Sequence, residues 1–372
     1  MSRITIDLSA IPTKITGVGR YAIEMVSTFG SVVECNGLDL VCLTRKGDVE
    51  RIQRLLPGRE LLGIVPNSRA ARLLFEERGL GRMLGRSSIA LHHSIHYTIP
   101  RGFKGKVVTT IHDSTFLEHP EWHERSKVVF FKRAMAHAAK EADALIFPSE
   151  STKAGFLRHF DPVGYTEVIP HGVNVERFGL EQSDAESLER LGIKQPFLLF
   201  CGTLEPRKNL PRVIEAFAGL NAEDLVLVVA GLKGWGASAF TDPTTQNLLR
   251  DRRVIVVGYV SDLELGALYR QCIASLYPSL EEGFGLPALE AVSQGTLLIT
   301  SAGSAMIEVI GDGALTVDPL SVSCIREAIE VAVVGGAAVD AIRRRGIEMA
   351  KGFSWKSVAE KHCNLYRRIL GA

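Results

Sequence analysis

Two glutamates flank a glycine-rich turn in the sequence EGFGLPALE, residues 282–290. The Gly-Phe-Gly turn at 283–285 precedes Pro287, and proline is favoured in the first turn of a helix. A helix N-terminus exposes unpaired N–H groups and a partial positive charge, so this turn suits a phosphate. Carboxylates such as Glu282 and Glu290 accept hydrogen bonds from the vicinal hydroxyls of a sugar or ribose. The pattern favours a nucleotide sugar; in the alternative interpretation Glu290 complements the helix dipole and Glu282 is a solvated loop acid.

A second anion-binding signal lies in CGTLEPRKNL, residues 201–210. An apolar strand should end near Gly202, and Asn209 is the expected N-cap of the helix that follows. Arg207 and Lys208 precede that helix, where they could neutralise a diphosphate and stabilise charge on a leaving group. Because loops after parallel strands meet at one edge of the sheet, we expect this loop to lie near Glu282.

The first half has its own glycine loop, in which Gly17, Gly19 and Ala22 satisfy the dinucleotide-binding spacing G-x-G-x-x-A. An NAD(P)-dependent oxidoreductase is therefore an alternative, with Arg45 available for NADP. The glycines follow the first strand by about nine residues instead of directly, and the second strand ends without the acid that holds an NAD ribose. In the other interpretation, Gly17 brings backbone amides to a ligand of the second domain.

His112 ends another apolar run, at a ligand-facing edge, where it could contact a phosphate or a sugar hydroxyl or carry a proton. The alternative is a histidine bonded to the backbone. His92, His93 and His96 invite a zinc interpretation, but they lack cysteine or acid ligands at the spacing of a zinc site. The sequence also has no D-x-D motif. We therefore expect a metal-independent site with no cofactor.

Composition limits the partners and the compartment. The 372 residues suit two domains, and 43 basic against 42 acidic residues give no reason to expect nucleic acid. The six cysteines are scattered without a C-x-x-C pair, which favours buried thiols in a reducing compartment. No signal-peptide pattern or membrane-spanning stretch is visible, so a cytoplasmic protein is expected.

Short apolar runs alternate with helical stretches along the chain, which is typical of parallel α/β folds. Strands are expected at 4–8, 38–43, 61–65, 88–93, 106–112, 143–149, 166–170, 197–202, 225–231, 254–260, 274–279, 297–301 and 314–317. Residues 171–196 are polar and are expected to connect the domains. The pattern S-x-x-E at Ser261 and Glu264 predicts a helix N-terminus.

Together these motifs resemble those of the retaining GT-B glycosyltransferases of family 4, over essentially the whole chain. The resemblance is carried by Glu282 to Glu290 as an E-x7-E element, GTLEPRKNL, TGVGRY, IPHGVN and FSWKSVAEKHCNLYR. It implies two Rossmann-like domains facing a central cleft. Residues 1–175 would form the acceptor side and 195–353 the nucleotide-sugar side, with a helix at 354–372 returning to the first domain.

The resemblance also implies roles. Arg207 and Lys208 would bind the donor diphosphate, Glu282 would hold the donor sugar, and Glu290 the ribose. His112 would lie near the transferred sugar and would be catalytic with Arg207, Lys208 and Glu282. Backbone groups would complete the donor site at Gly17, Val260, Gly283, Phe284, Gly285 and Leu286. Thr203 follows Gly202 where many relatives outside this subgroup carry arginine, so phosphate binding would rest more heavily on the Arg-Lys pair.

More narrowly, VVTTIHDSTFLEHPEW is similar to bacterial mannosyltransferases of O-antigen or exopolysaccharide chains. This implies GDP-mannose or a related GDP-linked deoxyhexose as donor, and a growing, lipid-linked glycan as acceptor. Residues 67–88 intersperse arginines with leucines, so they would either lie on an anionic membrane or form an ordinary amphipathic helix. A catalytically silent sugar- or nucleotide-binding protein is the remaining alternative.

Overall fold

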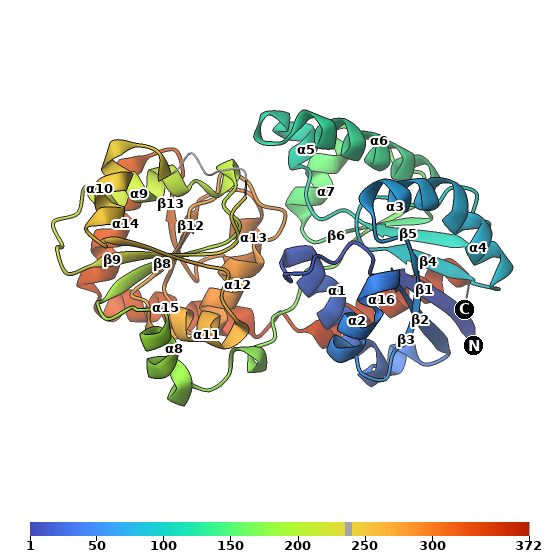
Figure 1. Ribbon diagram of the computed structural model, residues 1–372, viewed down its shortest axis with the longest axis horizontal. Coiled ribbons are helices and arrows are strands. Elements are labelled where there is room, and N and C mark those ends of the chain that lie inside the picture. Colours follow the sequence, from blue (N-terminus) through green and yellow to red (C-terminus); the bar gives the residue numbers. More distant parts are fainter. Residues whose placement is uncertain (235–239, 372) are drawn as a thin grey trace. The chain divides into compact units, whose positions relative to one another are not determined.

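The computed structural model describes residues 1–234 and 240–371 and divides into two compact units. Unit 1 comprises Met1–Gly172 and Ser354–Ala372, and unit 2 comprises Val173–Phe353. Each unit is built around its own parallel sheet with helices on both faces (Figure 1). Within the described residues, no helix is both long and apolar enough to cross a bilayer.

The sheet of unit 1 has the strand order β3-β2-β1-β4-β5-β6-β7, with every neighbouring pair parallel. Its strands are β1 (Ser2–Asp7), β2 (Leu38–Arg45), β3 (Glu60–Val65), β4 (Leu91–Ser94), β5 (Lys106–Thr110), β6 (Ala144–Phe147) and β7 (Tyr165–Val168). Its helices are α1 (Gly17–Thr28), α2 (Val49–Leu55), α3 (Arg69–Phe75), the π-helical turn η4 (Glu76–Leu80), α4 (Gly81–Arg86), α5 (Thr115–Glu118), α6 (Arg125–Glu141), α7 (Glu150–Leu157) and α16 (Trp355–Leu370).

The sheet of unit 2 has the order β10-β9-β8-β11-β12-β13, also all parallel. Its strands are β8 (Phe197–Cys201), β9 (Val226–Ala230), β10 (Val254–Gly258), β11 (Ser275–Tyr277), β12 (Leu298–Ser301) and β13 (Leu315–Val317). Its helices are α8 (Asp184–Arg190), α9 (Leu210–Ala218), α10 (Pro243–Arg250), α11 (Asp262–Gln271), α12 (Leu286–Ser293), α13 (Ala305–Ile310), α14 (Val322–Val334) and α15 (Ala337–Ala350).

Strands that are covered on both faces must be apolar along their whole length, and this is why the strands could be located from the sequence. All five residues of β9 are buried, for example, as are the first four of β8. Each apolar run expected to be a strand is a strand, and the capping box of Ser261 and Glu264 begins α11. The expected parallel α/β architecture in two Rossmann-like sheets is confirmed.

Both sheets reverse their strand order at the first strand of the unit. In unit 1 the neighbours of β1 are β2 and β4, and in unit 2 the neighbours of β8 are β9 and β11. At such a switch point the connections leave in opposite directions and open a crevice at the carboxyl ends of the strands, where ligands bind. The fold therefore offers two candidate positions, one in each unit.

The segment 171–196 is more than a connection between domains, because most of it belongs to unit 2. Phe178 is fully buried, and its ring meets that of Tyr269 edge-on with centroids 5.9 Å apart. Asp184 at the start of α8 is buried and accepts two hydrogen bonds from Arg270, at 2.5 and 2.9 Å. This segment is polar in sequence because α8 carries a buried acid, Asp184, whose charge is paired with Arg270.

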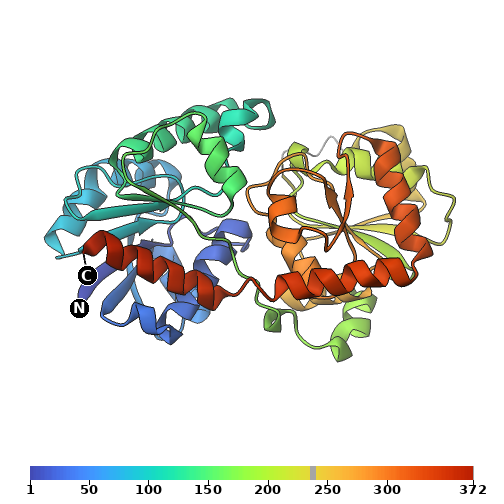
Figure 2. The ribbon, with the colours of Figure 1, turned by 180° about the vertical axis from the view of Figure 1, so that it is seen from behind.

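The expectation of unpaired thiols is wrong for two of the six cysteines. Cys35 and Cys363 form a disulfide between η2 (Val33–Cys35) and α16. Cys42 and Cys272 are buried thiols, as expected, whereas Cys201 and Cys324 are only partly buried. Spacing did not indicate the bond, because its partners lie 328 residues apart. Figure 2 shows α16 lying along unit 1, where it packs against α1.

Candidate active site

The switch point of unit 2 brings together Arg207, Lys208 and Glu282, as the sequence predicts. Lys208 Nζ donates to Glu282 Oε1 at 2.6 Å, and Arg207 Nη1 donates to Glu282 Oε2 at 2.7 Å. Both basic residues follow β8, and Glu282 follows the adjacent strand β11. A backbone bond of 2.7 Å from Leu280 N to the carbonyl of Arg207 ties the two loops together. One carboxylate thus holds two cations side by side.

Two further residues complete this cluster. The Lys208 ammonium also contacts the hydroxyl of Tyr277, at the end of β11, and Arg207 Nε donates to Glu205 at 2.9 Å. The side chains of Lys208 and Glu282 are only 8% and 5% exposed, so their charges act in a weakly screened environment. Burial alone would raise the pKa of Glu282, but the charges of Arg207 and Lys208 outweigh it and lower this pKa to about 2. Glu282 is therefore ionised at neutral pH.

Asn209 occupies the predicted N-cap position of α9 but does not cap it. Its backbone is left-handed, with φ of 65°, and no side-chain cap bond forms. The amide instead donates to the carbonyls of Pro278 at 3.0 Å and Pro319 at 2.6 Å. Asn209 therefore fixes the loop that carries Lys208 to the end of β11, which is a positioning role that the capping pattern did not reveal.

The turn at 283–286 leads into α12, with Pro287 in its first turn, as predicted. Gly285 has φ of 90°, a left-handed conformation that strains a residue with a Cβ, and a Cβ there would also displace the end of the Met306 side chain, whose Cε would lie 2.0 Å away. The ring of Phe284 is buried and meets Phe353 edge-on, with centroids 6.0 Å apart. These contacts fix the backbone of Gly283, Phe284, Gly285 and Leu286 beside Glu282.

Glu290 is on α12, and in this structure its carboxylate is paired. It contacts Arg177 of η6 (Glu176–Phe178), which also donates to Asp262 at 2.7 Å. The side chains of Arg177 and Glu290 are about equally inaccessible, at 9% and 10% exposure. The sequence signal for Glu290 was its spacing from Glu282, whereas nothing in the spacing pointed to Arg177.

The remaining predicted donor contacts lie on other elements. Val260 follows β10 and precedes the capping box of α11, and it is partly buried. Gly17 belongs to unit 1 and begins α1, where a Cβ would meet no atom within 4 Å. The structure thus groups Arg207, Lys208, Glu282 and the 283–286 turn directly, while Gly17 and His112 are placed within unit 1.

His112 lies just beyond β5 in unit 1, and its Nε2 donates to the carbonyl of Ile95 at 2.7 Å. Burial lowers the pKa of His112 to about 4, so the ring is neutral at pH 7. With the proton on Nε2, Nδ1 is a hydrogen-bond acceptor. The backbone bond considered as an alternative is therefore present, and it fixes the orientation of the ring.

Of the two histidines within β4, His93 connects the sheet to α16. A chain of hydrogen bonds of 2.6–3.0 Å runs from the Tyr366 hydroxyl through His93, Thr110, Tyr21 and His362 to the carbonyl of Val358. His362 Nδ1 must donate to that carbonyl, so Nε2 accepts from Tyr21, and every other proton in the chain is then assigned. His92 bonds Thr5 at 2.8 Å and Ser94 at 3.2 Å. Among the described residues no cluster of metal ligands is found.

The segment 67–88 is folded as short helices on the core of unit 1. Leu80 and Leu84 are buried in a cluster with Leu43 and Val65, against which Phe75 and Met83 also pack. Leu74 is the exposed member, at 53%. Most of the apolar face that would enter a membrane is therefore occupied by the core.

Comparison with known proteins gives the class. Residues 15–177 match the family described as Glycosyltransferase Family 4, and residues 183–348 match Glycosyl transferases group 1. With its two parallel-sheet units, the chain belongs to the GT-B glycosyltransferases of group 1 and family 4.

The chain is also similar to individual proteins of these families. The chain is similar to O-antigen chain mannosyltransferase B of Escherichia coli, at 26% identity over 389 aligned positions that cover 99% of this chain and 100% of the relative. Its fold resembles sucrose-phosphate synthase of Thermosynechococcus elongatus, with a TM-score of 0.79, 19% identity and full coverage of both chains. It also resembles HepE of Anabaena, solved in complex with UDP, with a TM-score of 0.74, 16% identity and coverage of 99% and 100%.

Proposed function

We propose that this glycosyltransferase transfers mannose from GDP-mannose to a hydroxyl of a growing, lipid-linked glycan, with retention at the anomeric carbon and without a metal. The similarity to an O-antigen mannosyltransferase over both full lengths supports the sugar and the acceptor class. The observation that carries the proposal is the cluster in which Glu282 holds Arg207 and Lys208 side by side at the switch point of unit 2.

The cluster suits the departure of a nucleoside diphosphate. Two cations that are already held together need little reorganisation when negative charge grows on the leaving phosphate. Each oxygen of Glu282 accepts one bond from a cation and can accept another, so the carboxylate can also receive hydroxyls of the donor sugar. The amides of 283–286 and the start of α12 add positive potential beside them.

In this proposal retention comes from attack on the same face of the sugar that the diphosphate leaves. Glu282 is committed to two cations and is a poor covalent nucleophile, which argues against a double displacement through a glycosyl-enzyme intermediate. The departing phosphate oxygen takes the acceptor proton. His112, neutral and with Nδ1 as an acceptor, orients a hydroxyl near the transferred sugar.

The direct test is turnover. Purified protein is incubated with a panel of nucleotide sugars and mannose-terminated acceptors, and release of nucleoside diphosphate is measured with and without EDTA. GDP-mannose should be the best donor, EDTA should have no effect, and NMR of the product should show an α-linkage. Transfer from a UDP-sugar alone would refute the donor assignment, and binding of NAD(P) with no turnover would favour the oxidoreductase alternative.

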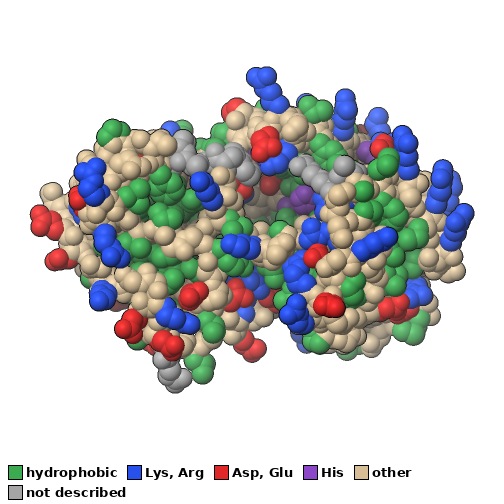
Figure 3. Space-filling model, viewed as in Figure 1, with side chains coloured by type: hydrophobic (Ala, Val, Ile, Leu, Met, Phe, Trp, Pro, Cys, Tyr) green, Lys and Arg blue, Asp and Glu red, His purple; other side chains and the backbone are tan. Residues whose placement is uncertain are grey.

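The proposal includes contact between basic side chains of unit 1 and an anionic membrane. Exposed Lys and Arg side chains gather over α4 and α6 of unit 1 (Figure 3). Such a surface is attracted to anionic headgroups by about 1 kcal/mol for each basic residue close to the membrane. Sedimentation with phosphatidylglycerol vesicles should therefore pull down the protein at low salt and release it at high salt, whereas neutral vesicles should not bind it.

A further inference from the structure

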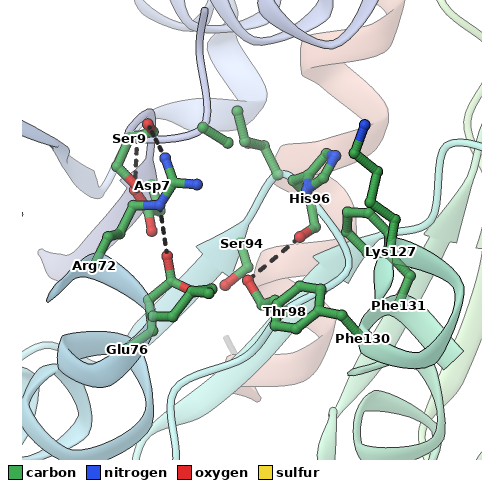
Figure 4. A pocket seen from close by; sticks show the side chains of 13 residues that line it. Asp7, Ser9, Arg72, Glu76, Ser94, His96, Thr98, Lys127, Phe130 and Phe131 are labelled. Carbon is green, nitrogen blue, oxygen red and sulfur yellow. Dashed lines mark hydrogen bonds and ion pairs between the residues drawn. The ribbon is translucent and has the colours of Figure 1, made fainter. Parts of the chain in front are cut away.

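A pocket of about 170 Å³ lies at the switch point of unit 1, outside the donor residues predicted above. Asp7 at the end of β1 and Ser94 at the end of β4 line it, and these two strands are where the order of the sheet reverses. Figure 4 shows Asp7, Arg72 and Glu76 on one side of the pocket and Lys127, Phe130 and Phe131 of α6 on the other. Its position is the one where open parallel sheets bind ligands.

The polar side contains two carboxyl groups that share one arginine. Arg72 Nε lies 3.6 Å from Glu76 Oε1, and Arg72 Nη1 donates to the carbonyl of Ser9 at 3.1 Å. Asp7 is 7% exposed and accepts a hydrogen bond of 2.8 Å from the backbone of Ser9. The arginine is therefore held in place by the backbone and cannot neutralise both acids when they are ionised.

The pKa of each of the two acids is raised from its ordinary value. Burial, and then the charge of Asp7, raise the pKa of Glu76 to about 7, against the opposing effect of Arg72. Burial also raises the pKa of Asp7. The other charged or titratable groups lining the pocket are Arg72 on α3, His96 after β4 and Lys127 on α6. Near neutral pH the Asp7 and Glu76 pair can both donate and accept hydrogen bonds, as vicinal hydroxyls require.

The opposite side of the pocket is aromatic. Phe131 packs edge-on against His96, with ring centroids 5.3 Å apart, and it lies at an angle to Tyr97, at 5.0 Å. Phe130 lies beside it on α6. A pyranose presents hydroxyl groups at its edge and C–H groups on its face. The acids of this pocket can bind the hydroxyls, and the aromatic side chains opposite them can cover the C–H face.

The pocket also adjoins His112. The carbonyl that His112 binds belongs to Ile95, and Ile95 and His96 both line the pocket. The rings of His96 and His112 have centroids 6.4 Å apart. A ring held in the pocket would therefore lie next to the histidine proposed to orient the attacking hydroxyl.

We propose that this pocket binds the terminal sugar of the acceptor as a single uncharged hexose ring, with Asp7 and Glu76 on its hydroxyls and the phenylalanines against its face. The inference rests on the proposed function and adds the acceptor's chemical class. The volume is below the roughly 300–1,000 Å³ of pockets for larger ligands, so one ring is held and the remainder of the glycan lies outside. Arg72 and Lys127 balance the formal charges of ionised Asp7 and Glu76, so the pocket has no excess charge to hold a uronic acid or a phosphorylated sugar.

The test uses two small probes on the full chain: methyl α-mannopyranoside and the anionic methyl α-glucuronopyranoside, each titrated by saturation-transfer NMR at pH 7. The neutral glycoside should bind the wild type, and Glu76→Gln and Asp7→Asn should each weaken binding at least tenfold. The matched control is Glu77→Gln, because Glu77 is the next residue, is 55% exposed and does not line the pocket. Circular dichroism of each variant establishes that it is folded.

The double variant Asp7→Asn with Glu76→Gln provides a test in which binding is gained instead of lost. It leaves Arg72 without its acids, so the glucuronoside should bind this variant more tightly than it binds the wild type. Unchanged binding of the neutral glycoside in both single variants, or tighter binding of the anionic one by the wild type, would overturn the inference. Failure of the proposed function would look different, because the wild type would then release no nucleoside diphosphate from any nucleotide sugar while still binding the glycoside.

Discussion

The ammonium of Lys208 lies 2.6 Å from a carboxylate oxygen of Glu282, and both side chains are almost completely buried. These two residues come from loops after adjacent strands, 74 positions apart in the sequence. Lys208 has so little access to water that it depends strongly on Glu282, without which its charge would be uncompensated, whereas Glu282 without Lys208 keeps the Arg207 guanidinium.

Removing either member of this pair should abolish most turnover. Lys208→Met and Glu282→Gln are each expected to lower kcat by roughly 10²- to 10³-fold, because the preorganised charge at the leaving group is lost. The measurement is nucleoside diphosphate release under saturating donor. Lys194→Met, at an exposed position of the same unit, is the control.

Loss of stability must be separated from loss of chemistry here. Glu282→Gln leaves the buried charge of Lys208 unpaired, which costs roughly 3–5 kcal/mol, whereas in Lys208→Met the Glu282 carboxylate keeps Arg207. The double variant Lys208→Met with Glu282→Gln removes both charges and should recover part of that free energy of unfolding, while its turnover stays low. Wild-type rates in any of these variants would contradict the assignment of the site.

Arg177 should affect donor binding more than the chemical step. Its guanidinium pairs with Glu290, the predicted ribose ligand, and also binds Asp262 at 2.7 Å. In Arg177→Met the Glu290 carboxylate loses its charged partner and its fixed orientation, so KM for the nucleotide sugar should rise severalfold with a smaller change in kcat. Asp262→Asn, which keeps the Arg177–Glu290 pair, should have the weaker effect. An equal fall of kcat in both variants would contradict a role of Arg177 in donor binding through Glu290.

Acid should destabilise unit 1 at a higher pH than unit 2. All ten histidines of the sequence lie in unit 1. Burial lowers the pKa of His112 and of His362 to about 4, and also lowers those of His92, His93, His96 and His171. The unfolded chain therefore takes up protons below about pH 6.5 that the folded unit does not bind, so the stability of unit 1 falls between about pH 6.5 and 4.

In unit 2 the corresponding loss of stability occurs at lower pH. Glu282 is ionised in the folded state down to about pH 2, so its contribution is present above the unfolded pKa of about 4.3 and is lost as the pH falls from there toward 2. Hydrogen exchange read by mass spectrometry, stepped from pH 7 to pH 4.5 and corrected for the intrinsic exchange rate, should show β4 and β5 losing protection before β8 and β11. The reverse order would contradict this assignment of the acid-sensitive groups.

The disulfide of Cys35 and Cys363 should stabilise unit 1 measurably. Cross-linking residues 328 positions apart restricts the unfolded chain, and native disulfides of this kind typically contribute about 2–4 kcal/mol. Cys363→Ser should lower Tm in the absence of reductant, and dithiothreitol should lower the Tm of the wild type but not that of the variant. A wild-type Tm insensitive to reductant would show that the bond contributes nothing.

The sequence was most informative where one element determines its own structure. The strands were readable because both faces of each sheet are covered, and the helix at Leu286 was readable from Gly285 and Pro287. The meeting of Lys208 with Glu282 could also be predicted, because parallel strands end at a common edge. These features depend on local pattern and on one rule of topology.

Features that depend on a distant partner were not predicted. Arg177 is 113 residues from Glu290, and nothing in either local sequence indicates the other. Asp7 could have been suspected as an acid at the end of the first strand, but its neighbours Arg72 and Glu76 arrive on a helix whose position the sequence does not specify. The same holds for Cys35 and Cys363, since their type is visible in the sequence and their proximity is not.

The hydrogen-bonded chain of unit 1 both begins and ends on α16, at Tyr366 and at Val358. During synthesis, the ribosome makes unit 2 as one continuous stretch, 173–353, before it reaches that helix. The strands of unit 1 are therefore synthesised before α16, and His93 and Tyr21 lack their partners on α16 until that helix has been made. In this chain the C-terminal unit can finish folding before the N-terminal one.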